Sequence, residues 1–218
     1  LDRSLVDAHP ATRMIKRAKE QPRERTLSDD EIRNLWEALD ADPGPASDAV
    51  RLRLMLGQRG AEINGMRWAD VDLGSATWMM PGELTKNGRP HTVALAPAAL
   101  ERLTRRRSEV PEGEPRVFPG LSMQSQNYRE LAAIHGGQYE WKDLRRTMAT
   151  GLAGLGFSET TIGRCLNHAR HTVTAKHYNQ HLYLAETRAA LEAWEGEIDR
   201  IINKRDADRQ VLPFPGRH

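Results

Sequence analysis

The spacing of apolar residues predicts a chain that is mainly helical. Ser28 and Glu31 form a capping-box pattern, and apolar residues then recur at helical spacing at Ile32, Leu35 and Leu39. A second helix is predicted from about Ser47, and Pro97 is placed to open another. Apolar periodicity predicts further helices over 122–134, 141–155, 159–167 and 171–179.

Three short runs between these helices predict strands. They cover residues 68–73, 77–80 and 92–95, and each is rich in apolar or β-branched residues. The dipeptide Asn87-Gly88 before the last run is typical of a hairpin turn. The predicted fold class is therefore mainly α with a small three-stranded antiparallel β-sheet, an α+β arrangement.

An apolar stripe bordered by charged residues lies near the C-terminus, at Leu184, Leu191, Trp194, Ile198 and Ile201. Residues with this spacing share one face of a helix, which must be covered. Two partners remain open for this face: the core of the same domain, or a neighbouring protomer.

The predicted domain organisation has three parts. Residues 1–25 are polar, basic and interrupted by Pro10 and Pro22, which predicts a linker. Residues 26–195 are predicted to form one domain, and 196–218 the end of a C-terminal helix and a tail. The chain begins at Leu1 without an initiator methionine, so we expect a fragment of a longer protein.

Composition narrows the function classes. The single cysteine, Cys165, excludes a disulfide framework and favours a reducing, cytoplasmic location. No apolar run is long enough for a membrane span. The formal net charge is only +2, but basic residues cluster in two places: the first 25 residues, and Arg102, Arg105, Arg106 and Arg107. The second cluster predicts either phosphate contacts or a solvated helix face.

Candidate catalytic residues are spread along the chain in a fixed order: Arg59, Lys86, Lys142, Arg145, His168 and Tyr178. Together they are suited to attack on a phosphodiester without a metal. A phenol supplies the nucleophile, and two guanidiniums bind the non-bridging phosphate oxygens through paired N–H donors. The remaining groups can transfer a proton or stabilise charge in the transition state.

This order resembles the tyrosine recombinase (phage integrase) family, whose set is Arg, Lys, His-x-x-Arg, His or Trp, and Tyr. The resemblance covers about residues 26–195 in four blocks. They are GQRGAEINGMRWADVDL with Arg59 and Glu62, LTKNGRPHTVALAP with Lys86, WKDLRRTMATGLAGLG with Arg145, and IGRCLNHARHTVTAKHY with His168 and Tyr178. Four ordered blocks are far more specific than one motif.

Two positions depart from the family pattern. Lys142 stands at the first position of His-x-x-Arg, where lysine keeps a donor and a charge but is a poor base at neutral pH unless buried. Asn167 stands where the family usually has glycine. The nucleophile and both arginines are present, so the sequence favours an active enzyme.

The resemblance implies a reaction and its partners. Tyr178 would form a 3′-phosphotyrosyl intermediate, while Arg59 and Arg145 hold the phosphate. Lys86 would act as general acid, His168 would bind a phosphate oxygen, and Lys142 would add charge. The expected substrate is double-stranded DNA at a recombination site, acted on by four protomers, although the fragment alone could be a monomer. A core-binding domain would precede residue 1, and no cofactor is expected.

Other functions remain open. A type IB topoisomerase-like enzyme shares this chemistry, and the lysine at position 142 leaves a DNA-binding relative with impaired catalysis possible. An RNA-binding helical protein has no supporting motif, because few aromatic residues are available for base stacking. His177 and His181 share a helical face and could bind zinc, but HYNQH lacks the glutamate of a zinc protease helix.

Overall fold

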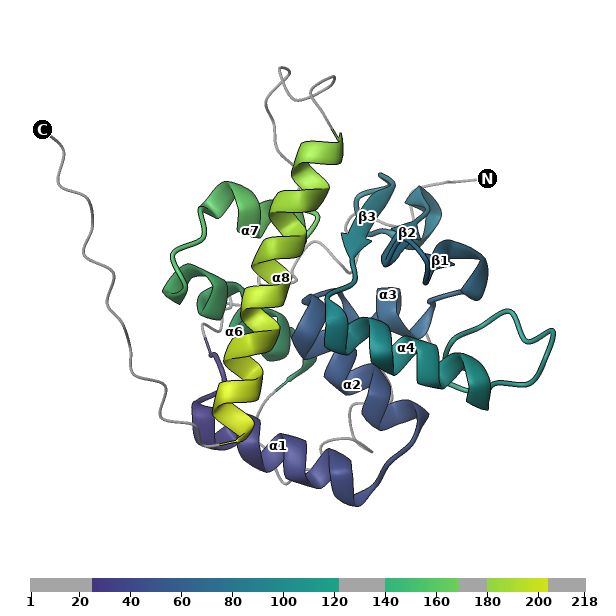
Figure 1. Ribbon diagram of the computed structural model, residues 1–218, viewed down its shortest axis with the longest axis horizontal. Coiled ribbons are helices and arrows are strands. Elements are labelled where there is room, and N and C mark those ends of the chain that lie inside the picture. Colours follow the sequence, from purple (N-terminus) through teal and green to yellow (C-terminus); the bar gives the residue numbers. More distant parts are fainter. Residues whose placement is uncertain (1–24, 122–139, 169–179, 204–218) are drawn as a thin grey trace, which may run out of the picture.

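The computed structural model describes residues 25–121, 140–168 and 180–203 (Figure 1). Short helices and one small sheet alternate along the first part of the chain, and helices follow. The elements are α1 (Asp29–Ala41), α2 (Pro45–Leu56), α3 (Gly60–Asn64), β1 (Val71–Asp72), β2 (Thr77–Met80), β3 (His91–Ala94), α4 (Pro97–Glu109), α6 (Trp141–Gly154), α7 (Glu159–Cys165) and α8 (Gln180–Ile202).

Helix α2 is the centre of the core. Every residue from Ser47 to Leu56 is buried, and the helix packs on α1, α3, α4, α6 and α8. A helix that is buried on all sides has no polar face to solvent, so its charged members need internal partners. Asp48 accepts from Arg102 (2.8 Å) and Arg105 (2.9 Å), which lie on α4.

The sheet is antiparallel, with strand order β1-β2-β3. Trp78 lies opposite Val71 on one side and Val93 on the other, and its side chain is fully buried. The predicted first strand is shorter than expected, because Trp68–Asp70 forms a 3-10 turn in which the Asp70 N–H donates to the Arg67 carbonyl (3.0 Å).

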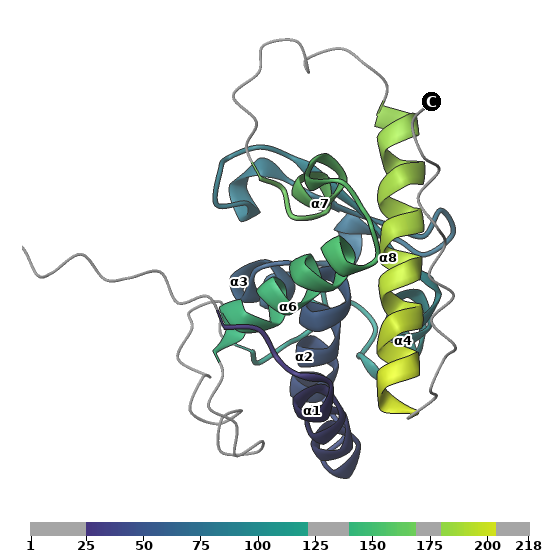
Figure 2. The same ribbon diagram turned by 90° about the vertical axis from the view of Figure 1, so that its left-hand side faces the viewer.

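Helix α8 runs along one side of the molecule, from α1 at one end to α7 at the other (Figures 1 and 2). Its apolar stripe packs on its own domain: Leu191, Trp194, Ile198 and Ile201 are all buried. The indole Nε1 of Trp194 donates to the Leu54 carbonyl of α2 (2.8 Å). The alternative, in which these residues face a neighbouring protomer, is wrong.

Most predicted elements are confirmed within the described residues. The Ser28–Glu31 capping box is present, and Pro97 opens α4. Helix α2 starts two residues before Ser47, because Pro45 already has the backbone geometry of a first helical turn. The helices predicted over 122–134 and 171–179 lie outside the described residues. Within the described residues, no helix combines the length and apolarity needed to cross a bilayer.

Candidate active site

Arg59 lies at the N-terminus of α3 and is held by Glu62. The backbone N–H of Arg59 donates to Oε2 of Glu62 (2.8 Å), and its Nη1 donates to Oε1 (2.9 Å). Glu62 is buried, whereas the Arg59 side chain keeps 31% of its surface exposed. A buried carboxylate thus fixes the guanidinium while leaving part of it accessible.

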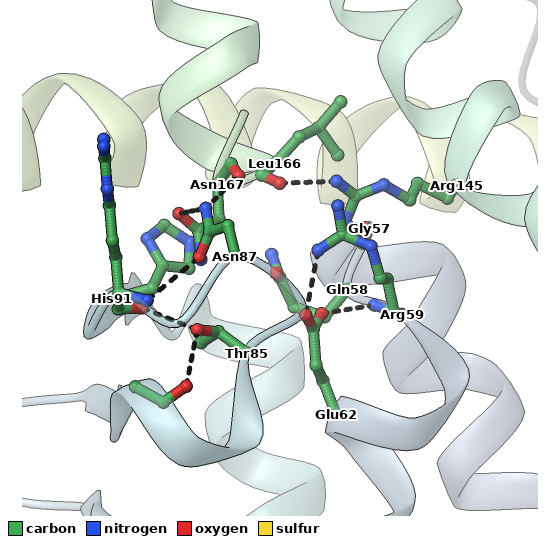
Figure 3. A network of polar contacts seen from close by, with 12 residues as sticks. Gly57, Gln58, Arg59, Glu62, Thr85, Asn87, His91, Arg145, Leu166 and Asn167 are labelled. Atoms are coloured by element: carbon green, nitrogen blue, oxygen red, sulfur yellow. Dashed lines mark hydrogen bonds and ion pairs between the residues drawn. The ribbon is translucent and has the colours of Figure 1, made fainter. Parts of the chain in front are cut away.

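Arg145 projects from α6 and binds two backbone carbonyls from distant segments. Its Nη1 donates to the Gly57 carbonyl (2.7 Å), and its Nη2 donates to the Leu166 carbonyl (Figure 3). Burial, followed by the nearby Arg59 guanidinium, lowers the pKa of Arg145 to about 10, and Glu62 partly offsets this. The positive charge of Arg145 is therefore destabilised in the free protein, and an anion bound beside it would stabilise this charge.

The C-terminal end of α7 accepts hydrogen bonds from three separate elements. The carbonyl of Cys165 accepts from Nε2 of Gln58 (2.8 Å) and from Nε2 of His91 (3.3 Å), which places the proton of that imidazole on Nε2. The carbonyl of Leu166 accepts from Arg145. Carbonyls at a helix C-terminus have no hydrogen-bond donor within the helix, so these side chains supply the missing hydrogen bonds.

The next carbonyl, that of Asn167, accepts from Nδ2 of Asn87 (3.2 Å) in the loop between β2 and β3. The carbonyl oxygens of residues 165–167 are called the α7 carbonyl cluster below. Through this cluster, the segments that carry Arg59, Lys86 and Arg145 all bind the turn that precedes His168. The fold therefore assembles the candidate residues by side-chain bonds to one helix end.

Lys86 is exposed at the tip of the β2–β3 connection. The Gly88 N–H donates to the Thr85 carbonyl (3.2 Å), so Lys86 and Asn87 are the central residues of a β-turn. Gly88 follows with a positive φ of 69°, a conformation that favours glycine. The predicted turn is confirmed, although it is centred one residue earlier than Asn87-Gly88.

A pocket of about 490 Å³ joins four of the predicted residues: Arg59, Lys142, Arg145 and His168. Trp141 and Arg146 also line it. Partial burial lowers the pKa of His168, and the Arg145 and Arg59 guanidiniums lower it further. His168 is therefore neutral at neutral pH in the free protein and can donate one N–H to an anion. Lys86 does not line this pocket.

Lys142 replaces the family histidine and forms an ion pair with Glu140 (3.0 Å). Both side chains are more than two-fifths exposed, at 57% and 43%, so the pair contributes little to stability and can open. Arg146 pairs with the buried Asp143 (3.1 Å). Tyr178 lies outside the described residues.

The arginine-rich part of α4 is largely engaged within the protein. Arg106 is buried and donates to the Val117 carbonyl (3.1 Å), while Arg107 lies over the ring of Trp68 (5.1 Å). Arg102 and Arg105 hold Asp48, as described above. A solvated helix face, one of the two predicted roles, is therefore not what these arginines form, because Arg102, Arg105 and Arg106 bind acceptors within the protein.

No group of three or more His, Cys, Asp or Glu side chains in the described parts of the chain could hold a metal ion. His177, one of the two predicted zinc-ligand candidates, lies outside them, and the side chain of His181 is likewise not described.

Three supporting residues were not singled out from the sequence. Gln58 and His91 bind the α7 carbonyl cluster, and burial lowers the pKa of His91. Arg53 stacks on Trp141 (4.0 Å from the ring centroid) and donates to the Gly60 carbonyl (3.3 Å) at the start of α3. Gln58 directly precedes Arg59, which is the one sequence feature that points to it. Its role could not be predicted, because its hydrogen-bond partner lies 107 residues away.

The family model of the phage integrase family matches residues 25–184 of this chain. The chain belongs to the phage integrase family. It is 30% identical over 168 residues to prophage integrase IntZ of Escherichia coli strain K12, an alignment covering 71% of this chain and 40% of that protein. The chain thus spans well under half the length of this family relative.

Solved structures of recombinases share the fold. XerA recombinase superimposes with a TM-score of 0.56 at 22% identity, over 83% of this chain and 66% of XerA. A lambda integrase fragment, solved as a dimer bound to a COC' core site, gives a TM-score of 0.55 at 20% identity, over 71% of this chain and 62% of that one. The mainly α fold with a small antiparallel sheet is therefore that of recombinase catalytic domains.

Proposed function

We propose that this chain is the catalytic part of a site-specific DNA recombinase or integrase that cleaves and rejoins double-stranded DNA. The observation that carries the proposal is the pairing of Arg59 and Arg145 with His168 around one pocket, in a member of the phage integrase family. Three cationic or hydrogen-bonding groups around one space suit a single bound phosphate.

The two guanidiniums bind the scissile phosphate. Each lacks a protein acceptor for part of its N–H donors among the residues that the structure describes, and a phosphate offers non-bridging oxygens for those donors. Negative charge on these oxygens grows in the pentacoordinate transition state, where the mutual repulsion of Arg59 and Arg145 is relieved most.

Tyr178 is the nucleophile in this proposal. Its phenol oxygen releases its proton to water and bonds to phosphorus, while the bond from phosphorus to the 5′ oxygen breaks. The Lys86 ammonium donates a proton to that leaving oxygen, which gives a 3′-phosphotyrosyl protein and a free 5′-hydroxyl. Lys142 adds positive charge. A 5′-hydroxyl of another strand reverses these steps, so rejoining needs no ATP.

The proposed partners are a DNA recombination site and further copies of the protein, four in the full strand exchange. Lambda integrase was solved as a dimer on a core site, which supports duplex DNA as the partner. The Lys86 turn and the pocket lie at the same end of α7, so one duplex could contact both.

A covalent adduct tests this function. The 218-residue chain is incubated with nicked suicide duplexes that carry a randomised core, and protein–DNA species that survive denaturant are isolated. Tyr178→Phe should abolish the adduct, and EDTA should leave its yield unchanged. Tyr183→Phe is the matched control, because it keeps the ring that lies under Arg164 (3.6 Å). An adduct that maps to Tyr183, or one that requires a metal, would contradict the proposal.

A further inference from the structure

Two side-chain amides join the β2–β3 turn to the end of α7. Nδ2 of Asn87 lies 3.0 Å from Oδ1 of Asn167 and 3.2 Å from the Asn167 carbonyl, and the reverse contact between Nδ2 of Asn167 and Oδ1 of Asn87 is 3.5 Å (Figure 3). These residues are 80 positions apart. The paired amides, Asn87 with Asn167, are called the amide latch below.

The amide latch joins the sequence neighbours of two candidate site residues. Lys86 precedes Asn87 in the β-turn, and His168 follows Asn167. Consecutive Cα atoms are about 3.8 Å apart, so a bond between the two asparagines also limits the separation of their neighbours. Lys86 lies outside the pocket, and its distance from a bound phosphate depends on where this turn is held.

The backbone of Asn167 explains why an amide can occupy this position. Its φ is 51°, in the left-handed region where glycine is favoured and asparagine is tolerated. The Asn167 N–H donates to the Arg164 carbonyl (3.2 Å), and the His168 N–H donates to the Gly163 carbonyl (2.9 Å). Glycine would satisfy the same helix ending, so what asparagine adds is its side chain.

We propose that Asn167 is a positioning residue, which acts through Asn87 to hold the Lys86 turn beside His168 and the bound phosphate. This inference rests on the proposed function, since it concerns the general acid of that reaction. In this arrangement the lysine approaches the leaving oxygen only while the turn is fastened to the end of α7.

The base of the hairpin is fastened independently, so loss of the amide latch should free only the tip. His91 binds the Cys165 carbonyl (3.3 Å), and Oγ1 of Thr85 lies 3.0 Å from the Gly82 carbonyl and 2.8 Å from that of Arg89. Strands β2 and β3 stay paired from Thr77 to Met80. Variants of the latch should therefore fold and keep their pocket.

Hydrogen–deuterium exchange tests the latch without any DNA. Asn167→Gly keeps the left-handed backbone and removes the amide, and the exchange of residues 84–90 should become at least threefold faster. The matched control is Ala76→Gly, because Ala76 also has a φ of 51° but lies in the β1–β2 turn. Unchanged exchange in Asn167→Gly, or an equal acceleration in Ala76→Gly, would overturn the inference.

Cleavage kinetics test the positioning. Asn87→Ala and Asn167→Gly should each slow adduct formation by about three- to tenfold, as expected for loss of one or two neutral hydrogen bonds. The double variant should be slower than Asn87→Ala alone by less than twofold, since the partner is already lost. Additive effects would mean that the two asparagines act separately, which would overturn the inference.

A leaving-group substitution connects the latch to Lys86. A 5′-bridging sulfur leaves readily without a proton. A substrate with this sulfur should therefore restore the cleavage rate of Lys86→Ala and of Asn167→Gly alike. It should not restore the rate of Arg145→Met. Rescue of Lys86→Ala without rescue of Asn167→Gly would overturn the positioning role. If the wild-type chain forms no adduct at all, the proposed function fails, and hydrogen exchange alone then decides whether the latch exists.

Discussion

Gly151 of α6 lies so close to Trp194 of α8 that a Cβ atom at this position would be 2.2 Å from Cζ3 of the indole. The ring cannot move away freely, because Trp194 is 2% exposed and its Nε1 is bonded to the Leu54 carbonyl. This contact fixes the spacing of α6 and α8. Helix α6 also carries Arg145, so the same contact supports the position of that guanidinium.

Gly151→Ala should therefore destabilise the protein by about 1–3 kcal/mol or more, through overpacking against a pinned ring. Chemical denaturation followed by tryptophan fluorescence measures the change. Gly154→Ala in the same helix is the matched control, because nothing lies within 4 Å of its added Cβ; it should be neutral or stabilising. Equal stability of both variants would show that α6 can shift away from α8.

Inorganic phosphate should stabilise the folded protein by binding the pocket. At ten times its dissociation constant, a ligand adds about 1.4 kcal/mol to the free energy of unfolding, which thermal denaturation detects. Arg145→Met should lose this stabilisation, because the buried guanidinium is a main phosphate donor. Arg116→Met, an exposed arginine outside the pocket, should keep it. A similar loss in both variants would indicate nonspecific ion binding.

His168 should titrate below the ordinary histidine pKa of about 6.5, because partial burial and two guanidiniums disfavour its charged form. Since the folded pKa is lowered, stability is lost as the pH falls through 6.5 toward the folded value. NMR of the imidazole carbon-bound protons, assigned with His168→Gln, measures the midpoint. Added phosphate should raise it, because an anion stabilises the imidazolium. A free-state midpoint above 6.5 would contradict this environment.

Cys165 should resist alkylation in the folded protein. Burial raises the pKa of its thiol to about 12, so the thiolate fraction at pH 8 is roughly a thousandfold below that of an ordinary thiol. It is the only cysteine in the chain, and mass spectrometry after iodoacetamide treatment reads it directly. Denaturant should restore fast reaction. Fast alkylation without denaturant would mean that the end of α7 opens readily.

Local sequence signals predicted local structure well. The capping box at Ser28, the proline at Pro97 and the turn beside Lys86 each depend on a few neighbouring residues, and each is confirmed. The first strand was predicted too long because the sequence does not reveal the turn at residues 68–70. The partner of the stripe on α8 was left open, because burial depends on contacts distant in sequence.

In the candidate site, too, contacts between sequence neighbours were easier to predict than contacts between distant residues. The motif block that the sequence singled out holds both Arg59 and its partner Glu62, since the two lie in one helical turn. The carbonyl acceptors of Gln58, Asn87 and Arg145 were not predicted, because a backbone oxygen carries no residue-type signal. Their partners also lie 107, 80 and 21 residues away. Only tertiary structure brings such groups together.

The α7 carbonyl cluster has a consequence for synthesis of the protein on the ribosome. Arg59, Lys86 and Arg145 leave the exit tunnel before residues 165–167. The backbone carbonyls of residues 165–167 bind the segments that carry these three residues. A nascent chain that ends before residue 165 contains Arg59, Lys86 and Arg145, but it lacks the α7 carbonyl cluster that holds their segments together. Phosphate binding should therefore arise abruptly once α7 has emerged, and incomplete translation products should lack it entirely.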